Sequence, residues 1–295
     1  MKILITGANG FIGSSVVSEF DQIGTYDIFA TDIGDTFKGA EKVTYIKGDF
    51  SKDNYVDHMI KTMPQCDVII HIGALINYDL FSKDVVMANC YGVQQIIKLA
   101  EESNCKKIIF MSSVPVIGKP INIPVTEEHS VNPPTAYHAS KVFAEHLLEM
   151  HANKNIIKTI FRLTSPIGKG MPSNRMLSVF INNINEGKEV LIYGKGIRKQ
   201  NYVDARDIAR AIDLACQKDV PGIFNIAGEK SFTSIELAKE CGKVLGKEVT
   251  IGYKDVVLED EYYDWEVSIE KANKILGYIP KYSLEQSIKH IAKEG

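Results

Sequence analysis

The chain has 295 residues, with 34 lysines and arginines against 37 aspartates and glutamates, and a formal net charge of −3. Its hydrophobic content of 45% and charged content of 24% are ordinary for a globular protein, and its length suits one large α/β unit or about two domains. The charge balance, without a long basic run, argues against nucleic acid or an acidic membrane as the main partner, and no apolar run reaches the roughly 20 residues that span a bilayer.

Short apolar runs alternate with helical patterns through the first half of the chain. Strands are predicted at residues 2–6, 28–31, 43–46, 67–71, 107–111 and 157–163. Helices are predicted between them, at residues 10–20, 54–63, 85–103 and 136–151. The strands are apolar with little alternation, as in a parallel sheet covered on both faces. The βαβαβ order therefore predicts an α/β fold with a doubly wound, Rossmann-type parallel sheet, whose ligands lie at the carboxyl ends of the strands.

The second half of the chain has shorter elements. Helices are predicted at residues 174–186, 206–217, 234–245 and 284–293, and strands at residues 190–193, 202–203 and 223–226. We predict a dinucleotide-binding domain at residues 1–165, to which residues 201–228 return. A smaller α+β substrate lobe is predicted at residues 166–200 and 229–295. The acidic segment 258–264 is interpreted as a solvated loop.

The N-terminus and the cysteines predict a cytoplasmic protein. Met1 and Lys2 lead directly into the first strand, without a signal-type apolar region. The cysteines are odd in number, widely spread and without C-x-x-C spacing, at Cys66, Cys90, Cys105, Cys216 and Cys241. This pattern favours reduced thiols over a disulfide framework, and it predicts no metal site.

A glycine pattern, Gly7-x-x-Gly10-x-x-Gly13, joins the first strand to the first helix. Gly7 permits a tight turn, Gly10 lets the backbone approach a pyrophosphate, and Gly13 lets the helix pack against the strand. The free N–H groups at the start of the helix attract phosphates. The pattern predicts a dinucleotide site that also includes Asn9, Phe11 and Ile12. The alternative is a plain glycine turn.

Asp32 ends the second strand, 19 residues after Gly13, where an acid accepts hydrogen bonds from ribose hydroxyls. No arginine or lysine follows until Lys38, so a 2′-phosphate would meet an uncompensated carboxylate. This favours NAD over NADP, although a turn-forming role for Asp32 is the alternative. Asp49 and Phe50, after the third strand, are also assigned to the cofactor, with Asp49 at its adenine.

Tyr137 and Lys141 form a Y-x-x-x-K pair on a predicted helix, where positions i and i+4 share a face. A neighbouring ammonium stabilises a phenolate and lowers the tyrosine pKa, so that the phenol can exchange a proton with a substrate hydroxyl. A surface contact between the two side chains is the alternative. Ser113 follows the fifth strand, at the sheet edge where a catalytic hydroxyl is expected.

Together the motifs resemble the extended short-chain dehydrogenase/reductase family, in particular its NAD-dependent epimerase/dehydratase branch, over nearly the whole chain. The matching segments are Gly7-x-x-Gly10-x-x-Gly13, Asp32, Asp49, His71-Ile-Gly-Ala74, Ser112-Ser113-x-x-x-x-Gly118, Tyr137-x-x-x-Lys141, Arg162-x-x-x-x-x-Gly168, Tyr202-Val-Asp-x-x-Asp207, Phe224-Asn-Ile-Ala227 and Leu276-Gly-Tyr-Ile-Pro280.

The resemblance implies roles for several of these residues. Tyr137 is the implied general acid/base, and Lys141 the residue that bonds the nicotinamide ribose and lowers the tyrosine pKa. Ser113 is implied to hydrogen-bond the reacting hydroxyl, and Ala74 to line the cofactor. Ser112 is interpreted as a helper or structural residue, and His71 is interpreted as a packed histidine at a strand end.

The chain departs from the family pattern at the substrate end. In sugar-nucleotide members, an asparagine and an arginine that contact the diphosphate stand at the positions of Ser165 and Gln200. Arg198, two residues before Gln200, is a candidate replacement, and the basic residues Lys195, Arg198 and Lys199 are candidates to face an anionic substrate. Their alternative is a solvated loop. A nucleotide-diphosphate substrate is therefore less secure than the fold suggests.

The leading hypothesis is an NAD-dependent epimerase or dehydratase-like enzyme acting on a nucleotide sugar. Val114 and Pro115 follow Ser113 where many dehydratases of this group carry Asp-Glu, so epimerisation or simple oxidation/reduction is favoured over dehydration. One alternative is a net reductase or dehydrogenase of a non-nucleotide alcohol or ketone, and another is a non-catalytic NAD sensor. By family analogy, helices 85–103 and 136–151 pair in a homodimer.

Overall fold

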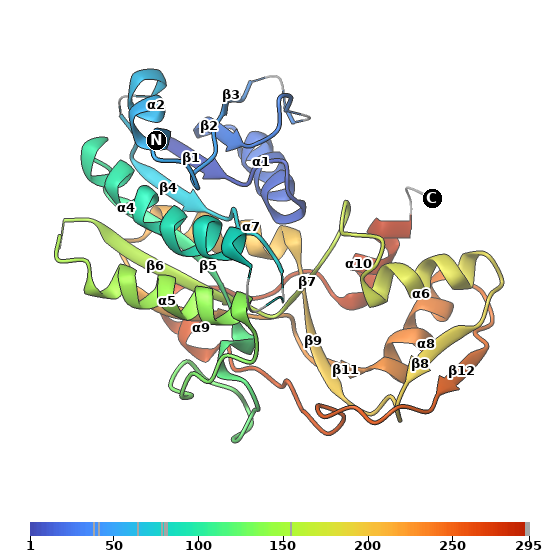
Figure 1. Ribbon diagram of the computed structural model, residues 1–295. Helices are drawn as coiled ribbons and strands as arrows, with labels where there is room; N and C mark the ends of the chain where they lie inside the picture. The colour runs from blue at the N-terminus through green and yellow to red at the C-terminus, as the bar shows by residue number, and fades with distance from the viewer. Residues whose placement is uncertain are drawn as a thin grey trace.

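The computed structural model describes residues 1–292, except 38, 41, 64, 78, 80, 81 and 154. A seven-stranded sheet forms the centre of a large lobe, and a smaller lobe lies beside it (Figure 1). The strands of the large sheet are β1 (Lys2–Thr6), β2 (Asp27–Asp32), β3 (Thr44–Lys47), β4 (Val68–His71), β5 (Lys107–Ser113), β6 (Ile157–Leu163) and β10 (Gly222–Ile226).

All neighbouring strands of this sheet are parallel, in the order β10-β6-β5-β4-β1-β2-β3. The chain builds outward from β1 on one side and from β4 on the other, so the strand order reverses between these two strands. Ligands of doubly wound sheets bind at such a reversal, beyond the carboxyl ends of the strands. The predicted fold class is therefore confirmed, and β10 joins the sheet as expected.

Helices cover both faces of the large sheet (Figure 1). One face packs against α1 (Phe11–Ile23), α7 (Ala205–Gln217) and α9 (Glu270–Leu276). The other packs against α2 (Tyr55–Thr62), α4 (Gly92–Glu102) and α5 (Ala136–Met150). Along β1, Ile3 and Ile5 belong to the first core and Leu4 to the second. This division explains why the middle of the strand, residues 3–5, is apolar without alternation.

Three short segments complete the large lobe. α3 (Lys83–Val85) and a π-helical segment, η1 (Val86–Tyr91), lead into α4, and a 3₁₀ turn, η2 (Val114–Ile117), follows β5. The predicted helix 85–103 is thus three consecutive segments.

The smaller lobe contains two small sheets. β7 (Ser165–Ile167), β9 (Lys199–Asp204) and β11 (Ser231–Thr233) form one, and β8 (Val190–Tyr193) and β12 (Ile251–Lys254) form the other. Its helices are α6 (Met176–Asn185), α8 (Ser234–Leu245) and α10 (Leu284–Ala292). Lys293, the predicted end of the last helix, lies outside the described residues.

The proposed division into two domains remains a prediction, with two departures. Residues 201–204, which were expected to return to the large lobe, belong to β9 and pair with β7 and β11 in the smaller lobe. Ala272 and Leu276 of α9, and Tyr278 after it, are buried in the core of the large lobe. This part of the segment 229–295 therefore packs against the large sheet rather than within the smaller lobe. Among the described helices, none combines the length and apolar character needed to cross a membrane.

Candidate active site

A cavity of about 1810 Å³ lies at the carboxyl edge of the large sheet and reaches the smaller lobe. Most of the residues assigned from sequence to the cofactor, the chemistry or the substrate line it: Gly7, Asn9, Gly10, Phe11, Ile12, Gly13, Asp32, Asp49, Phe50, Ala74, Ser113, Tyr137, Lys141, Ser165, Arg198 and Gln200. Lys195 and Lys199, the other two candidates to face an anionic substrate, do not line it. The fold therefore brings together residues that are up to 193 positions apart in the sequence (7 to 200).

The turn between β1 and α1 has the geometry of a phosphate loop. Gly7 has a φ of +68°, and a Cβ on it would lie 2.6 Å from the Cα of Gly73. A Cβ on Gly13 would lie 2.0 Å from the Gly7 carbonyl oxygen, so the helix packs on the loop only with glycine there. α1 has no side-chain cap and no acidic residue in its first turn. Its first N–H groups are thus available to an anion.

Asp32 is held at the rim of the cavity by the backbone. One carboxylate oxygen accepts a hydrogen bond from the Asn9 N–H at 2.9 Å, and the other accepts one from the Ile33 N–H at 2.8 Å. Lys47 pairs with Asp35 at 2.5 Å. This lysine is therefore already paired, and Lys38 lies outside the described residues. The loop and the carboxylate fit a dinucleotide with an unmodified ribose.

His71 is buried beneath this site, as expected for a packed histidine. Its Nδ1 lies 2.7 Å from the Thr6 hydroxyl, and its ring meets the edge of Phe50 with 5.2 Å between centroids. Burial, together with the charge of Lys141, lowers the pKa of His71 to about 3. The imidazole is thus neutral near pH 7. Asp49 accepts hydrogen bonds from the backbone and hydroxyl of Ser51, which fixes the turn that carries Phe50.

Tyr137 and Lys141 lie on the first turns of α5, whose N-cap is Thr135. The Lys141 ammonium is buried, donates to the Met111 carbonyl at 2.8 Å, and lies 5.7 Å from the centre of the Tyr137 ring. Burial lowers the pKa of Lys141 to about 8, while the negative charge of Glu145 opposes this shift. A cation in this position favours the phenolate form of the tyrosine.

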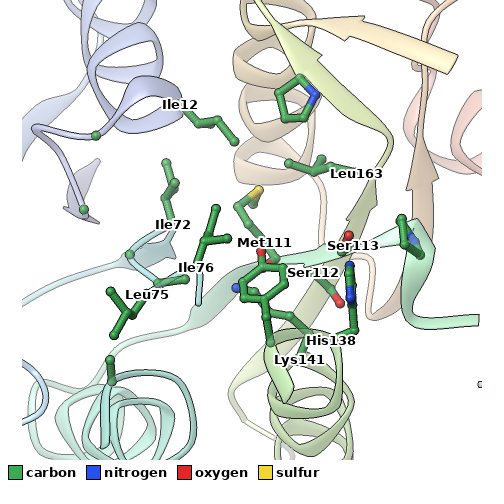
Figure 2. A pocket seen from close by; sticks show the side chains of 18 of the residues that line it. Ile12, Ile72, Leu75, Ile76, Met111, Ser112, Ser113, His138, Lys141 and Leu163 are labelled. Atoms are coloured by element: carbon green, nitrogen blue, oxygen red, sulfur yellow. The ribbon is translucent and has the colours of Figure 1, made fainter. Parts of the chain in front are cut away.

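The two serines that end β5 differ in their surroundings (Figure 2). Ser113 is half-buried and lines the cavity beside the first turns of α5. Ser112 is buried and donates its hydroxyl proton to Glu145, whose other oxygen pairs with Arg162 at 2.7 Å. This buried network fits the structural role expected for Ser112.

Apolar side chains form the inner part of the cavity between the glycine loop and Lys141 (Figure 2). They are Ile12, Ile72, Leu75, Ile76, Met111 and Leu163. The loop that carries Leu75 is fixed by Asn89 of the π-helical segment. The Asn89 side chain accepts from the Leu75 N–H at 2.8 Å, donates to the Leu75 carbonyl at 2.9 Å, and donates to the Ser140 hydroxyl at 3.0 Å. The sequence analysis missed Asn89, because it belongs to none of the motifs.

His138, which lines the cavity, is a second residue that the sequence analysis missed. Its Nδ1 lies 2.7 Å from the Thr135 hydroxyl, and its ring lies edge-on to Tyr137 at 5.1 Å between centroids. Burial, aided by the charge of Lys141, lowers the pKa of His138 to about 4. The signal available in the sequence was its position directly after Tyr137.

At the substrate end, the interpretation of residues 258–264 as a solvated loop is wrong. Leu258, Glu259, Asp260 and Tyr263 line the cavity, and Glu261 is buried. The segment contacts the basic residues Lys195, Arg198 and Lys199, which the sequence analysis named as candidates to face an anionic substrate. These contacts are an Arg198–Asp260 ion pair, a Lys199–Asp264 ion pair at 2.7 Å, and a hydrogen bond from the Lys195 ammonium to the Tyr262 hydroxyl at 2.7 Å.

Comparison with known proteins gives one family. The model of the NAD dependent epimerase/dehydratase family matches residues 3–227. The chain is 27% identical to a UDP-glucose 4-epimerase of Halalkalibacterium halodurans over 98% of this chain and 94% of that protein. It is 24% identical to a dTDP-D-glucose 4,6-dehydratase of Mus musculus, over 98% and 86%. The structure of a UDP-glucose 4-epimerase from Thermotoga maritima superimposes with a TM-score of 0.90, covering 99% of this chain and 98% of that chain at 24% identity.

Proposed function

Because the chain belongs to the NAD-dependent epimerase/dehydratase family, we propose that it is an epimerase of a nucleotide sugar. The observation that carries this proposal is the grouping of Tyr137, Lys141 and Ser113 in the cavity that begins at the glycine loop. NAD, when bound, supplies the acceptor and later the donor of a hydride. The relatives named above include an epimerase and a dehydratase that act on nucleotide sugars.

In the proposed mechanism the protein handles the proton. Tyr137, as phenolate, removes the proton of a sugar hydroxyl while the carbon that bears it is oxidised to a ketone. The Lys141 ammonium, 5.7 Å from the tyrosine ring, stabilises the phenolate. Ser113 hydrogen-bonds the reacting oxygen. The keto sugar then rotates in the cavity and presents its other face for reduction. Tyr137 returns the proton to the oxygen, which becomes the product hydroxyl.

Epimerisation is proposed rather than dehydration because of the residues that follow Ser113. Elimination of water needs a further acid and base next to the reacting carbons. Val114 and Pro115 begin the 3₁₀ turn after β5, and neither side chain exchanges a proton. An epimerase recycles its cofactor, whereas a net dehydrogenase accumulates the reduced form.

A panel of UDP- and dTDP-sugars tests the proposed function. We expect the NAD-loaded enzyme to convert one sugar into its epimer, seen by chromatography, without net absorbance of reduced nicotinamide. Tyr137→Phe is expected to lower turnover by about 10³-fold with NAD binding unchanged, since it removes the acid/base group. Tyr253→Phe, at an exposed tyrosine outside the cavity, is the matched control. Full activity of Tyr137→Phe contradicts the mechanism.

The second candidate function is a net reductase or dehydrogenase of a non-nucleotide alcohol or ketone. It is favoured by the substrate end, where Ser165 and Gln200 replace the diphosphate contacts of the family and Arg198 is paired with Asp260. In this case the substrate panel gives no epimer. Instead, reduced nicotinamide is produced or consumed in a one-to-one ratio with a small carbonyl compound.

We also propose that the protein is a cytoplasmic homodimer. The predicted pairing helices correspond to η1, α4 and α5, and large apolar side chains are exposed on two of these elements. Val86 of η1 and Phe143 of α5 are 55% and 43% exposed. The five cysteines form no disulfide, in keeping with a reducing compartment. Light scattering of the purified protein measures the oligomeric state.

A further inference from the structure

The acidic segment 258–264 neutralises the basic stretch at the substrate end of the cavity. Besides the side-chain pairs described above, the Lys195 N–H donates to the Glu261 carboxylate at 2.6 Å, and the Lys199 N–H donates to the Tyr263 carbonyl at 3.1 Å. Backbone and side chains thus both attach the segment to the connection between β8 and β9. An ion that enters this end of the cavity meets a basic stretch that already has carboxylate partners.

Arg198 is the member of this stretch that faces the cavity. One Nη atom pairs with the Asp260 carboxylate, and the other donates to the Gln200 amide oxygen at 2.8 Å. Arg198, Gln200 and Asp260 all line the cavity. A guanidinium binds a phosphate most strongly through two parallel N–H groups. Each Nη atom thus donates one of its two N–H groups to a protein oxygen. A phosphate that binds through the N–H group directed at Asp260 therefore competes with that carboxylate.

Asp260 is the partner that can be displaced. The side chains of Arg198 and Asp260 are 38% and 36% exposed, and ion pairs in contact with solvent contribute little to stability. Movement of Asp260 therefore breaks only the weak ion pair with Arg198 and does not disturb the hydrophobic core. While it stays in place, its negative charge and that of the neighbouring Glu259 repel an incoming phosphate.

We propose that Asp260 is a specificity-determining residue that competes with the anionic part of the substrate for Arg198. The proposal rests on the proposed function, since it concerns the diphosphate of a nucleotide sugar. Asp260 lowers the affinity of the cavity for free diphosphates. A nucleotide sugar binds tightly only when the contacts of its other groups offset the free energy needed to displace the Asp260 carboxylate from Arg198.

The test is the affinity of the NAD-loaded protein for inorganic diphosphate and for UDP, measured by calorimetry. Asp260→Asn removes the competing charge and leaves Arg198 in place. We expect both ligands to bind about tenfold more tightly, a change in the range of a hydrogen bond to a charged group. The matched control is Glu259→Gln, which removes the same charge from an adjacent cavity residue that has no ion pair with any described residue. Only a through-space repulsion is lost in this variant, so we expect a smaller gain in affinity than in Asp260→Asn. Arg198→Gln in the Asp260→Asn background is expected to abolish the gain.

Three results overturn the proposal. The first is that Asp260→Asn and the parent bind diphosphate with equal affinity, or that neither binds it. The second is that Glu259→Gln gains as much diphosphate affinity as Asp260→Asn. The third is that the gain in affinity persists when Arg198 is replaced. Thermal melting of each variant confirms that it is folded. A failure of the proposed function is distinguishable from these results. In that case the variants bind diphosphate with the expected relative affinities, but the enzyme converts no nucleotide sugar.

Discussion

His71 is a buried titratable side chain, and its burial makes stability depend on pH. Its pKa falls from 6.5 in the unfolded chain to about 3 in the folded one. Between these values the folded state binds fewer protons, so the stability present above pH 6.5 is lost as the pH falls. For this group alone, we expect the free energy of unfolding to be lower by about 2 kcal/mol at pH 5 than at pH 7.

Denaturant unfolding at several pH values checks this prediction. His71→Asn does not titrate, and its amide oxygen is an acceptor for the Thr6 hydroxyl that now contacts Nδ1. We expect a shallower loss of stability on acidification in the variant. The comparison uses the slope with pH, so an overall loss of stability in the variant does not affect it. Equal slopes in the two proteins contradict the account.

Residues within local motifs could be predicted from the sequence, and residues in long-range contacts could not. Gly7 and Gly13 follow from the spacing of one turn, and Tyr137 and Lys141 follow from the spacing of one helix. Asp260 lies 62 positions from Arg198, and no local pattern relates them. Its charge is typical of an exposed loop, and only the tertiary structure brings it into the cavity.

Among the elements, the π-helical segment η1 bears most directly on the site. Segments of this kind are rare and often occur at functional sites. Here it carries Asn89, whose side chain joins the loop after β4 to α5 through Leu75 and Ser140. The position of Leu75 in the apolar wall of the cavity therefore depends on this amide.

Asn89→Ala is expected to weaken NAD binding by about tenfold. The reason is that the Leu75 N–H and carbonyl both lose the hydrogen bonds that they make with the Asn89 side chain. Asn225→Ala is the control. Asn225 is also buried, and its amide donates to the backbone carbonyls of Val125 and Ser268. Neither of these partners lines the cavity, whereas Leu75, the partner of Asn89, does. Titration of NAD by fluorescence measures both variants. Equal affinities in the two contradict the role given to Asn89.

The elements that the sequence analysis missed are short and depend on distant partners. β11 and β12 have three and four residues and pair with β9 and β8. Such strands have little periodicity of their own, so neither their existence nor their register follows from local sequence. The long strands and helices of the large lobe were predicted with ends that differ by a few residues, since their apolar patterns repeat several times.

At the scale of the whole molecule, the cavity joins the two lobes because the C-terminal segment is anchored to both. The Asp207 carboxylate at the start of α7 accepts the backbone N–H groups of Lys281 and Tyr282, and Ser287 of α10 donates to Asp204. The fold class and the cofactor edge could be predicted from the strand order. The packing of α9 on the large sheet could not be predicted. It depends on contacts between segments that are far apart in the sequence, because smaller-lobe elements lie between α9 and the rest of the large lobe.

Native mass spectrometry of the purified protein, stripped of nucleotide and titrated with NAD in both oxidation states and with NADP, tests the central claim most directly. The account predicts one NAD per chain, bound about tenfold or more tightly than NADP because of the Asp32 carboxylate. Asp32→Ala is expected to narrow this preference. If the folded protein binds NAD in neither oxidation state, the cofactor site and the chemistry at Tyr137 are both contradicted.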